Sequence, residues 1–181
     1  MVDWDDIIDR EGPAVWRTVC RLLTHRADAE ECFQETFVAA LELWRRQPVR
    51  SARAVLQRLA TARAVDRLRQ RYRTRVHHNE GDDSVGRAVD HSPSPPDRAA
   101  AVELAESLRT ALAELPPKQA DVFCLHCLDG FSYREVADAL DMSVDDVGVT
   151  LHRARAKLRE ALGGQHGQQN KSAPAAPQVT R

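Results

Sequence analysis

The densest basic stretch of the sequence spaces its arginines at a helical repeat. Residues 50–75 hold nine arginines and one acid, Asp66. Four arginines recur every four residues and two more widen the row: Arg63, Arg67, Arg71 and Arg75, with Arg69 and Arg73. Residues four apart lie on one side of a helix, and a guanidinium donates in a planar fork that fits phosphate oxygens. The stretch therefore predicts contact with a polyanion such as nucleic acid, and a solvated helix surface is the alternative.

Acidic segments flank this basic stretch on both sides. Residues 1–42 hold ten acids and four bases, and residues 76–115 hold eight acids and three bases, although the net charge of the chain is −1. The segregation predicts polyanion contact in one place only. Within residues 28–44 the acids lie mostly off an apolar stripe formed by Phe33, Phe37 and Trp44.

Cysteine spacing raises the question of a metal site. Cys124 and Cys127 form a "CLHC" motif, but a four-ligand zinc site needs two more soft ligands at suitable spacing. Cys20 and Cys32 are remote, on the apolar sides of their predicted helices. We expect four packed, reduced thiols and neither a metal nor a cofactor. The sequence holds no glycine-rich phosphate loop and no nucleophile within a recognisable motif, so we expect no enzymatic activity.

No apolar run approaches the roughly 20 residues of a membrane span. The N-terminal "MVDWDDIIDR" lacks the apolar segment of a signal peptide. We therefore expect a cytoplasmic protein without membrane contact.

The periodic stretches are helical almost throughout, which predicts an all-α protein. Residues 77–98 are rich in Gly, Pro, Ser and acids and predict a flexible linker. We expect two small helical domains, 1–76 and 99–163, and a disordered tail, 164–181. We expect four helices in the first domain. The first is short and contains Trp4, Ile7 and Ile8, and the second begins near Pro13. The third is capped by Asp28 with Glu31, and the fourth is capped by Ser51.

The second domain matches a helix-turn-helix pattern, with a tight turn at Asp141 between two helices. Ser132 with Glu135 predicts a capping box for the first of these helices, and Asp141 can adopt the left-handed conformation at the turn. Its last helix, from Val144 to about Leu162, leads with Asp145 and Asp146, which suit the positive end of the helix dipole behind the N-cap Ser143. Those acids would repel phosphate, so DNA contact is expected further along, at Thr150, His152, Arg153, Arg155 and Lys157. The expected buried seam is Val144, Val147, Leu151, Ala154, Leu158 and Ala161.

Three motifs, in order and spacing, resemble extracytoplasmic-function sigma factors of bacterial RNA polymerase. They are "ADAEECFQETFVAAL" (27–41), "LQRLATARAVDRLRQRYR" (56–73) and "LPPKQADVFCLHCLDGFSYREVADALDMSVDDVGVTLHRARAKL" (115–158). The resemblance implies core RNA polymerase and promoter DNA as partners, and leaves open whether an anti-sigma factor binds. It implies that the first domain docks on the clamp helices of the polymerase through Asp28, Glu31, Gln34 and Glu35.

The resemblance also assigns the two DNA contacts. Residues 63–73 would lie against the promoter −10 element as it melts, and residues 143–160 would read the −35 element. The chain departs from the family pattern at Val55 and Ala62, where Trp and Asn are frequent. It departs again at residues 148–150, where a Lys-Ser-Arg segment is common. We expect these departures to weaken or change promoter preference.

Three other functions fit parts of the sequence. A free-standing transcription regulator would use the helix-turn-helix but needs a sensor or dimerisation domain where the acidic and arginine-rich helices stand. A thiol-based redox enzyme or zinc-linked sensor would use "CLHC". A decoy would engage polymerase but not promoters.

Overall fold

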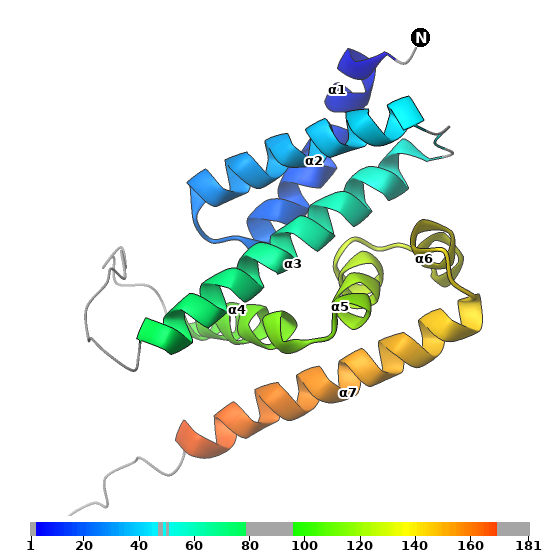
Figure 1. Ribbon diagram of the computed structural model, residues 1–181. Coiled ribbons are helices and arrows are strands. Elements are labelled where there is room, and N and C mark those ends of the chain that lie inside the picture. The colour runs from blue at the N-terminus through cyan, green and yellow to red at the C-terminus, as the bar shows by residue number, and fades with distance from the viewer. Residues whose placement is uncertain (1–2, 47–48, 50, 79–95, 170–181) are drawn as a thin grey trace, which may run out of the picture.

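The computed structural model describes residues 3–46, 49, 51–78 and 96–169, so most of the predicted linker and the residues after 169 lie outside the described residues. The described part contains helices and no strand, which confirms the all-α prediction. Figure 1 shows the arrangement. The elements are α1 (Trp4–Leu22), α2 (Arg26–Arg46), α3 (Ala52–His78), α4 (Pro96–Glu114), α5 (Pro117–Phe123), a π-helical segment η1 (Cys124–Leu128), α6 (Tyr133–Leu140) and α7 (Val144–Gln169).

The first helix runs unbroken through Pro13, so the prediction of two helices there is wrong. A proline inside a helix removes one hydrogen bond and costs about 3 kcal/mol. Burial outweighs that cost, because one side of α1 is buried on both sides of the proline, from Ile7 to Val15, Val19 and Leu22. Each such side chain contributes about 1.5–3 kcal/mol when fully buried.

Two cap predictions in the first domain have different outcomes. Ser51 caps α3 as expected, since its Oγ accepts a hydrogen bond of 3.2 Å from the amide of Ala54. Asp28 does not cap α2, because the helix already begins at Arg26 and Asp28 lies in its first turn. The Asp28 carboxylate instead forms an ion pair with Arg71 of α3.

Local signals in the second domain are confirmed. Ser132 and Glu135 form a reciprocal capping box on α6, and Asp141 adopts the left-handed conformation with φ of 50° at the turn. Ser143 Oγ accepts from the Asp146 amide at 3.0 Å and donates to the Asp146 carboxylate at 2.8 Å. Asp146 and Ser143 therefore together cap the start of α7.

The buried seam of α7 differs from the prediction at its first residue. Val144 is 46% exposed, the next members Val147, Leu151, Ala154 and Leu158 are buried, and the last member, Ala161, is half-buried. Val144 is the first residue of α7, and helical periodicity takes no account of where the partner helices end, so it overestimates burial there. The helix also continues to Gln169, past the expected end near Leu162.

The two domains pack against each other, with α3 between α2 on one side and α4, α5 and α6 on the other (Figure 1). One continuous core cluster joins Val65 of α3 and Leu22 of α1 to Leu112 of α4 and Leu158 of α7. A smaller cluster around Val136, Val147 and other residues holds the helix-turn-helix together. The sequence predicted two domains on a tether and gave no sign of this contact.

Polar contacts line the interface between the domains. Asp129, whose side chain is 4% exposed, accepts a hydrogen bond of 2.6 Å from the Thr18 hydroxyl and lies 3.4 Å from the Arg21 guanidinium. Arg21 also donates to the Leu128 carbonyl, and Arg69 donates to the Leu115 carbonyl at 2.9 Å. These hydrogen bonds and ion pairs provide partners for carbonyl groups at helix ends and for the buried Asp129 carboxylate, where the two domains meet.

One carboxyl in this region gives stability a testable pH dependence. Burial raises the pKa of Asp121 from 3.8 to about 6, against the opposing effect of Arg69, while Asp66 raises it and Arg58 lowers it. The folded state therefore holds this proton more tightly than the unfolded state, so the contribution of Asp121 to stability is greatest below pH 4 and is lost as the pH rises through 6.

We expect Asp121→Asn to stabilise the protein at pH 7.5, by on the order of 1–2 kcal/mol, and to change little at pH 4. Urea unfolding followed by circular dichroism at both pH values measures this difference. The exposed Asp138, changed to Asn, is the matched control and should show no such pH dependence. A stabilisation of equal size at both pH values would contradict the assignment.

Candidate functional site

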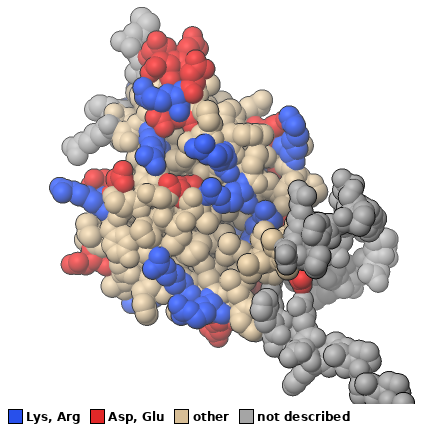
Figure 2. Space-filling model, turned by 180° about the vertical axis from the view of Figure 1, so that it is seen from behind, with Lys and Arg blue, Asp and Glu red and all other residues tan. Residues whose placement is uncertain are grey.

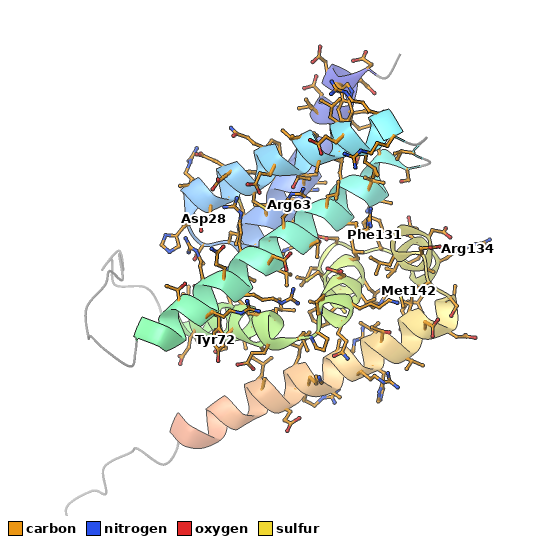
Figure 3. All side chains as sticks on the ribbon, viewed as in Figure 1. Asp28, Arg63, Tyr72, Phe131, Arg134 and Met142 are labelled. Carbon is orange, nitrogen blue, oxygen red and sulfur yellow. The ribbon has the colours of Figure 1, made fainter. Side chains whose placement is uncertain are left out.

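The acids that the sequence marked for partner binding lie together on α2. Glu31, Gln34 and Glu35 line a shallow groove with Glu42 and with Arg63 of α3. Asp28 lies one turn before them, at the start of α2 (Figure 3). Val38 lines the same groove and is 57% exposed. An exposed aliphatic side chain among acids suits a partner surface that carries basic and apolar side chains together.

Two arginines of the basic row face these acids. Arg67 donates from Nη1 to Glu31 Oε2 at 2.8 Å, and its Nη2 lies 2.9 Å from Glu35 Oε1. Arg71, one turn further along α3, forms the ion pair with Asp28. The hydrogen bond from Arg67 lowers the pKa of Glu31, so this carboxylate stays ionised. The expected DNA-binding row and the expected docking acids are therefore in direct contact.

The other arginines of the row have different surroundings. Arg69 points to the opposite side of α3, where it pairs with Asp66 at 2.8 Å and is 15% exposed. Arg73 is exposed, and the side chain of Arg75 lies outside the described residues. Arg63 lines the groove, and within the described part of the chain no carboxylate forms an ion pair with it. Only Arg63 and Arg73 of this row thus have a guanidinium without an ion-pair partner in the described residues.

The exposed side of α7 carries the residues expected to read DNA. His152 and Arg153 are exposed, and Thr150 is half-buried beside them. Lys157 is also exposed, one turn further along. Arg155 lies closer to the body of the protein, where it donates to the sulfur of Cys127 at 3.5 Å. Four of the five residues are thus available on the outer side, and Arg155 lies at its edge.

The sequence reading missed two surface residues near the helix-turn-helix. Arg134 lies in the first turn of α6 and points away from the body of the molecule (Figure 3). Val149 is 51% exposed on the outer side of α7. In helix-turn-helix proteins the first helix crosses the nucleic-acid backbone, and this rule was the signal that could have identified Arg134. Figure 2 shows other basic side chains in separate groups on the rear surface.

The "CLHC" motif lies in the π-helical segment η1. Cys124 and Cys32 are buried as expected, and burial raises the pKa of both thiols, that of Cys32 to about 11. Cys20 and Cys127 are exposed, so the prediction of packed thiols is wrong for these two. The i→i+5 bond from the Asp129 amide to the Cys124 carbonyl widens the turn and rotates Cys127 off the buried side.

Nothing in the described residues assembles a metal site around these cysteines. The described part of the chain holds no group of three or more His, Cys, Asp or Glu side chains placed to bind a metal ion. His126 is engaged otherwise, with Nδ1 2.7 Å from the Phe131 carbonyl and its ring 4.8 Å from that of Tyr133. Through His126 the motif contacts the loop that leads into α6.

The two cysteines of this motif should respond differently to substitution. We expect Cys124→Ser to lower the free energy of unfolding by about 1–3 kcal/mol, because it buries a hydroxyl without a hydrogen-bond partner. Cys127→Ser, at the surface, should stay within about 0.5 kcal/mol. Alkylation of the native protein should label Cys127 rapidly and Cys124 only on unfolding. Rapid labelling of Cys124 would contradict its burial.

Comparison with known proteins finds two families along the chain: Sigma-70 region 2 over residues 7–74 and Sigma-70, region 4 over residues 105–158. The RNA polymerase sigma-E factor of Streptomyces antibioticus is 30% identical over 163 residues, covering 90% of this chain and 86% of that protein. The ECF RNA polymerase sigma factor SigE of Mycolicibacterium smegmatis is 28% identical, and the match covers 90% of this chain and 62% of that protein.

Solved structures share the arrangement of helices. The sigma factor RpoE from Bartonella quintana, solved with the anti-sigma factor NepR, matches with a TM-score of 0.54 at 21% identity, covering 89% of this chain and 97% of that one. CnrH, solved with the cytosolic domain of CnrY, matches with a TM-score of 0.56 at 25% identity, covering 88% of this chain and 87% of that one. Among the described residues, no helix is long and apolar enough to span a membrane.

Proposed function

The chain belongs to the extracytoplasmic-function sigma factors, which direct bacterial RNA polymerase to its promoters, and we propose which of its surfaces meets each partner. The α2 groove binds core polymerase, Arg63 and Arg73 of α3 meet the −10 element, and the outer side of α7 reads the −35 element. The protein works in the cytoplasm, where the polymerase and DNA are, and needs no catalytic residue of its own.

The observation that carries this proposal is the composition of the α2 groove. Glu31, Gln34, Glu35 and Glu42 surround the exposed Val38, on a helix that belongs to the region 2 match. Such a surface favours a basic partner and disfavours DNA, because phosphate would meet several carboxylates. The acidic α2 side of the groove is therefore a protein-binding surface, and the DNA contacts must come from α3, which supplies Arg63 to the groove, and from α7.

On α3 we assign the −10 contact to Arg63 and Arg73, whose guanidinium groups have no carboxylate partner in the described residues. A phosphate contact from each would be independent of base sequence and sensitive to salt. Arg69 is turned into the interface between the domains and would reach DNA only if that interface changed.

On α7 we assign the −35 contact to Thr150, His152, Arg153 and Lys157. The acids at the start of the helix, Asp145 and the Ser143-bound Asp146, keep phosphate away from its N-terminus, so bases are met from the second turn onward. Arg134 on α6 supplies a phosphate contact that fixes the orientation of the reading helix. With so few cations, this domain binds DNA weakly on its own. Attachment to the polymerase raises its effective concentration at the promoter and compensates for the weak affinity.

An anti-sigma factor is a further partner under this proposal. The RpoE structure was solved with such a protein, NepR, and this chain shares its arrangement of helices. The apolar groove between α4 and α7, formed around Leu104, Leu108 and Phe123, is available for a protein contact.

A run-off transcription assay with purified core polymerase and genomic promoter fragments tests the function. We expect specific transcripts with the wild-type chain and at least a tenfold loss with Glu35→Lys, because it reverses the charge at the centre of the groove. Glu30→Lys is the matched control. Glu30 lies outside the groove, where it pairs with the exposed Arg26 at 2.7 Å, so its replacement should change transcript yield less than twofold.

Co-purification with core polymerase should follow the same pattern, with helicity unchanged in both variants. Full activity and polymerase binding by Glu35→Lys would remove α2 from the docking surface. Tight, sequence-specific promoter binding by the chain alone at physiological salt would instead favour a free-standing regulator.

A further inference from the structure

The ion pairs between α2 and α3 form a ladder. Arg67 contacts Glu31 and Glu35, and Arg71 contacts Asp28, so advancing one turn along α3 means moving back one turn along α2. The helices are thus antiparallel at this point, and both arginines face the same side of α2. Glu31 and Glu35 line the proposed docking groove, and Asp28 lies one turn before it on α2.

The Arg67 guanidinium joins two carboxylates that would otherwise repel each other. Glu31 and Glu35 are four residues apart on one side of α2, where like charges destabilise a helix. Arg67 uses one Nη atom for each of them, at 2.8 and 2.9 Å. Lysine could not reproduce this bridge, because its ammonium is a point charge without a planar fork.

Exposure shows which side of the bridge a partner would meet. The Arg67 side chain is 20% exposed, whereas Glu31 is 63% and Glu35 46% exposed. The arginine therefore lies beneath the two carboxylates, which face outward. To reach a DNA phosphate, Arg67 would have to break both ion pairs and leave two like charges side by side.

The bridge occupies one oxygen of each glutamate. Arg67 contacts Glu31 Oε2 and Glu35 Oε1, so the second oxygen of each carboxylate remains to accept from a cationic partner. Holding both side chains in place before binding reduces the conformational entropy lost on docking. Arg63, one turn earlier on α3, lines the groove without a carboxylate partner among the described residues and has no such role.

We propose that Arg67, supported by Arg71, is a positioning residue for polymerase docking: it orients Glu31 and Glu35 toward the polymerase and does not bind the promoter. This inference rests on the proposed function of α2. It divides the regular arginine row in two, with Arg67 and Arg71 serving the protein contact and Arg63 serving the DNA contact.

A double-mutant cycle on affinity for purified core polymerase tests the proposal, with thermal unfolding of every variant measured alongside. We expect Arg67→Ala to weaken core binding roughly 5–30-fold, as expected when two ordered side chains are released. In the Glu31→Gln/Glu35→Gln background the same change should cost less than twofold. A purely structural role would instead give equal losses in both backgrounds and would overturn the proposal.

The salt dependence of open-complex formation tests which of the two arginines, Arg63 or Arg67, contacts DNA phosphate. Arg63→Ala should lower the slope of log affinity against log salt by about 0.7–0.9, as one lost phosphate contact implies. Arg67→Ala should leave this slope as in the wild type, once polymerase is saturating. A loss of 0.7–0.9 in the slope with unchanged core affinity would show that Arg67 binds DNA.

Further variants keep the test decisive. If Arg67→Ala does not fold, Arg67→Lys replaces it, and we expect an intermediate loss of core affinity because lysine retains one contact. Wild-type affinity for core in Arg67→Lys would overturn the inference. Failure of the wild-type chain to bind core would overturn the proposed function as well, whereas normal wild-type binding with a neutral Arg67→Ala would overturn the inference alone.

Discussion

One guanidinium held between two carboxylates connects the parts of this molecule that carry its function. Arg67 ties α3 to α2 and at the same time fixes the outward direction of Glu31 and Glu35. The bridge is required because α3 is rich in arginine and packs against α1, α2 and the second domain. A helix so enclosed must neutralise arginines at its contacts, and α2 provides carboxylates for this purpose.

The segregation of charge along the sequence follows from the same constraint. The acidic N-terminal segment supplies counter-charges for the basic helix, and the same residues form the surface that we propose for polymerase docking. On the opposite side of α3, Arg69 is satisfied by Asp66 and by the Leu115 carbonyl, so that side joins the two domains. Asp129 holds the interface from the second domain, at a depth where burial raises its pKa. The relative placement of α3 and α7, the helices that we propose to meet the promoter, depends on these contacts in the free chain.

Local signals in the sequence predicted local structure well. The caps at Ser51 and Ser132 and the left-handed turn at Asp141 each depend on residues within one helical turn, and the structure confirms them. The predictions that are wrong depend on distant packing or unusual geometry. Pro13 does not break α1, because a buried side continues past it, and Cys127 is exposed because a π-helical turn rotates it outward.

The candidate site shows the same limit. Helical spacing indicated which residues share one side of α3, but not what faces that side, so a pair as distant as Glu31 and Arg67 was not predicted. The docking acids were assigned through resemblance to the sigma factors, and the structure groups Glu31, Gln34 and Glu35 around one groove. Arg134 was missed because a single exposed arginine has no periodic signal.

Side-chain NMR of the free chain, labelled with ¹⁵N-arginine, tests the central interaction most directly. A guanidinium that bridges two carboxylates rotates slowly about its Nε–Cζ bond, so Arg67 should give two separate Nη signals at neutral pH. Arg63 should give one averaged signal, and the Arg67 signals should merge in the Glu31→Gln/Glu35→Gln variant. Comparison with the Arg67→Lys spectrum assigns the signals. A single averaged Nη signal for Arg67 in the wild-type chain would contradict the bridge and the division of the arginine row that depends on it.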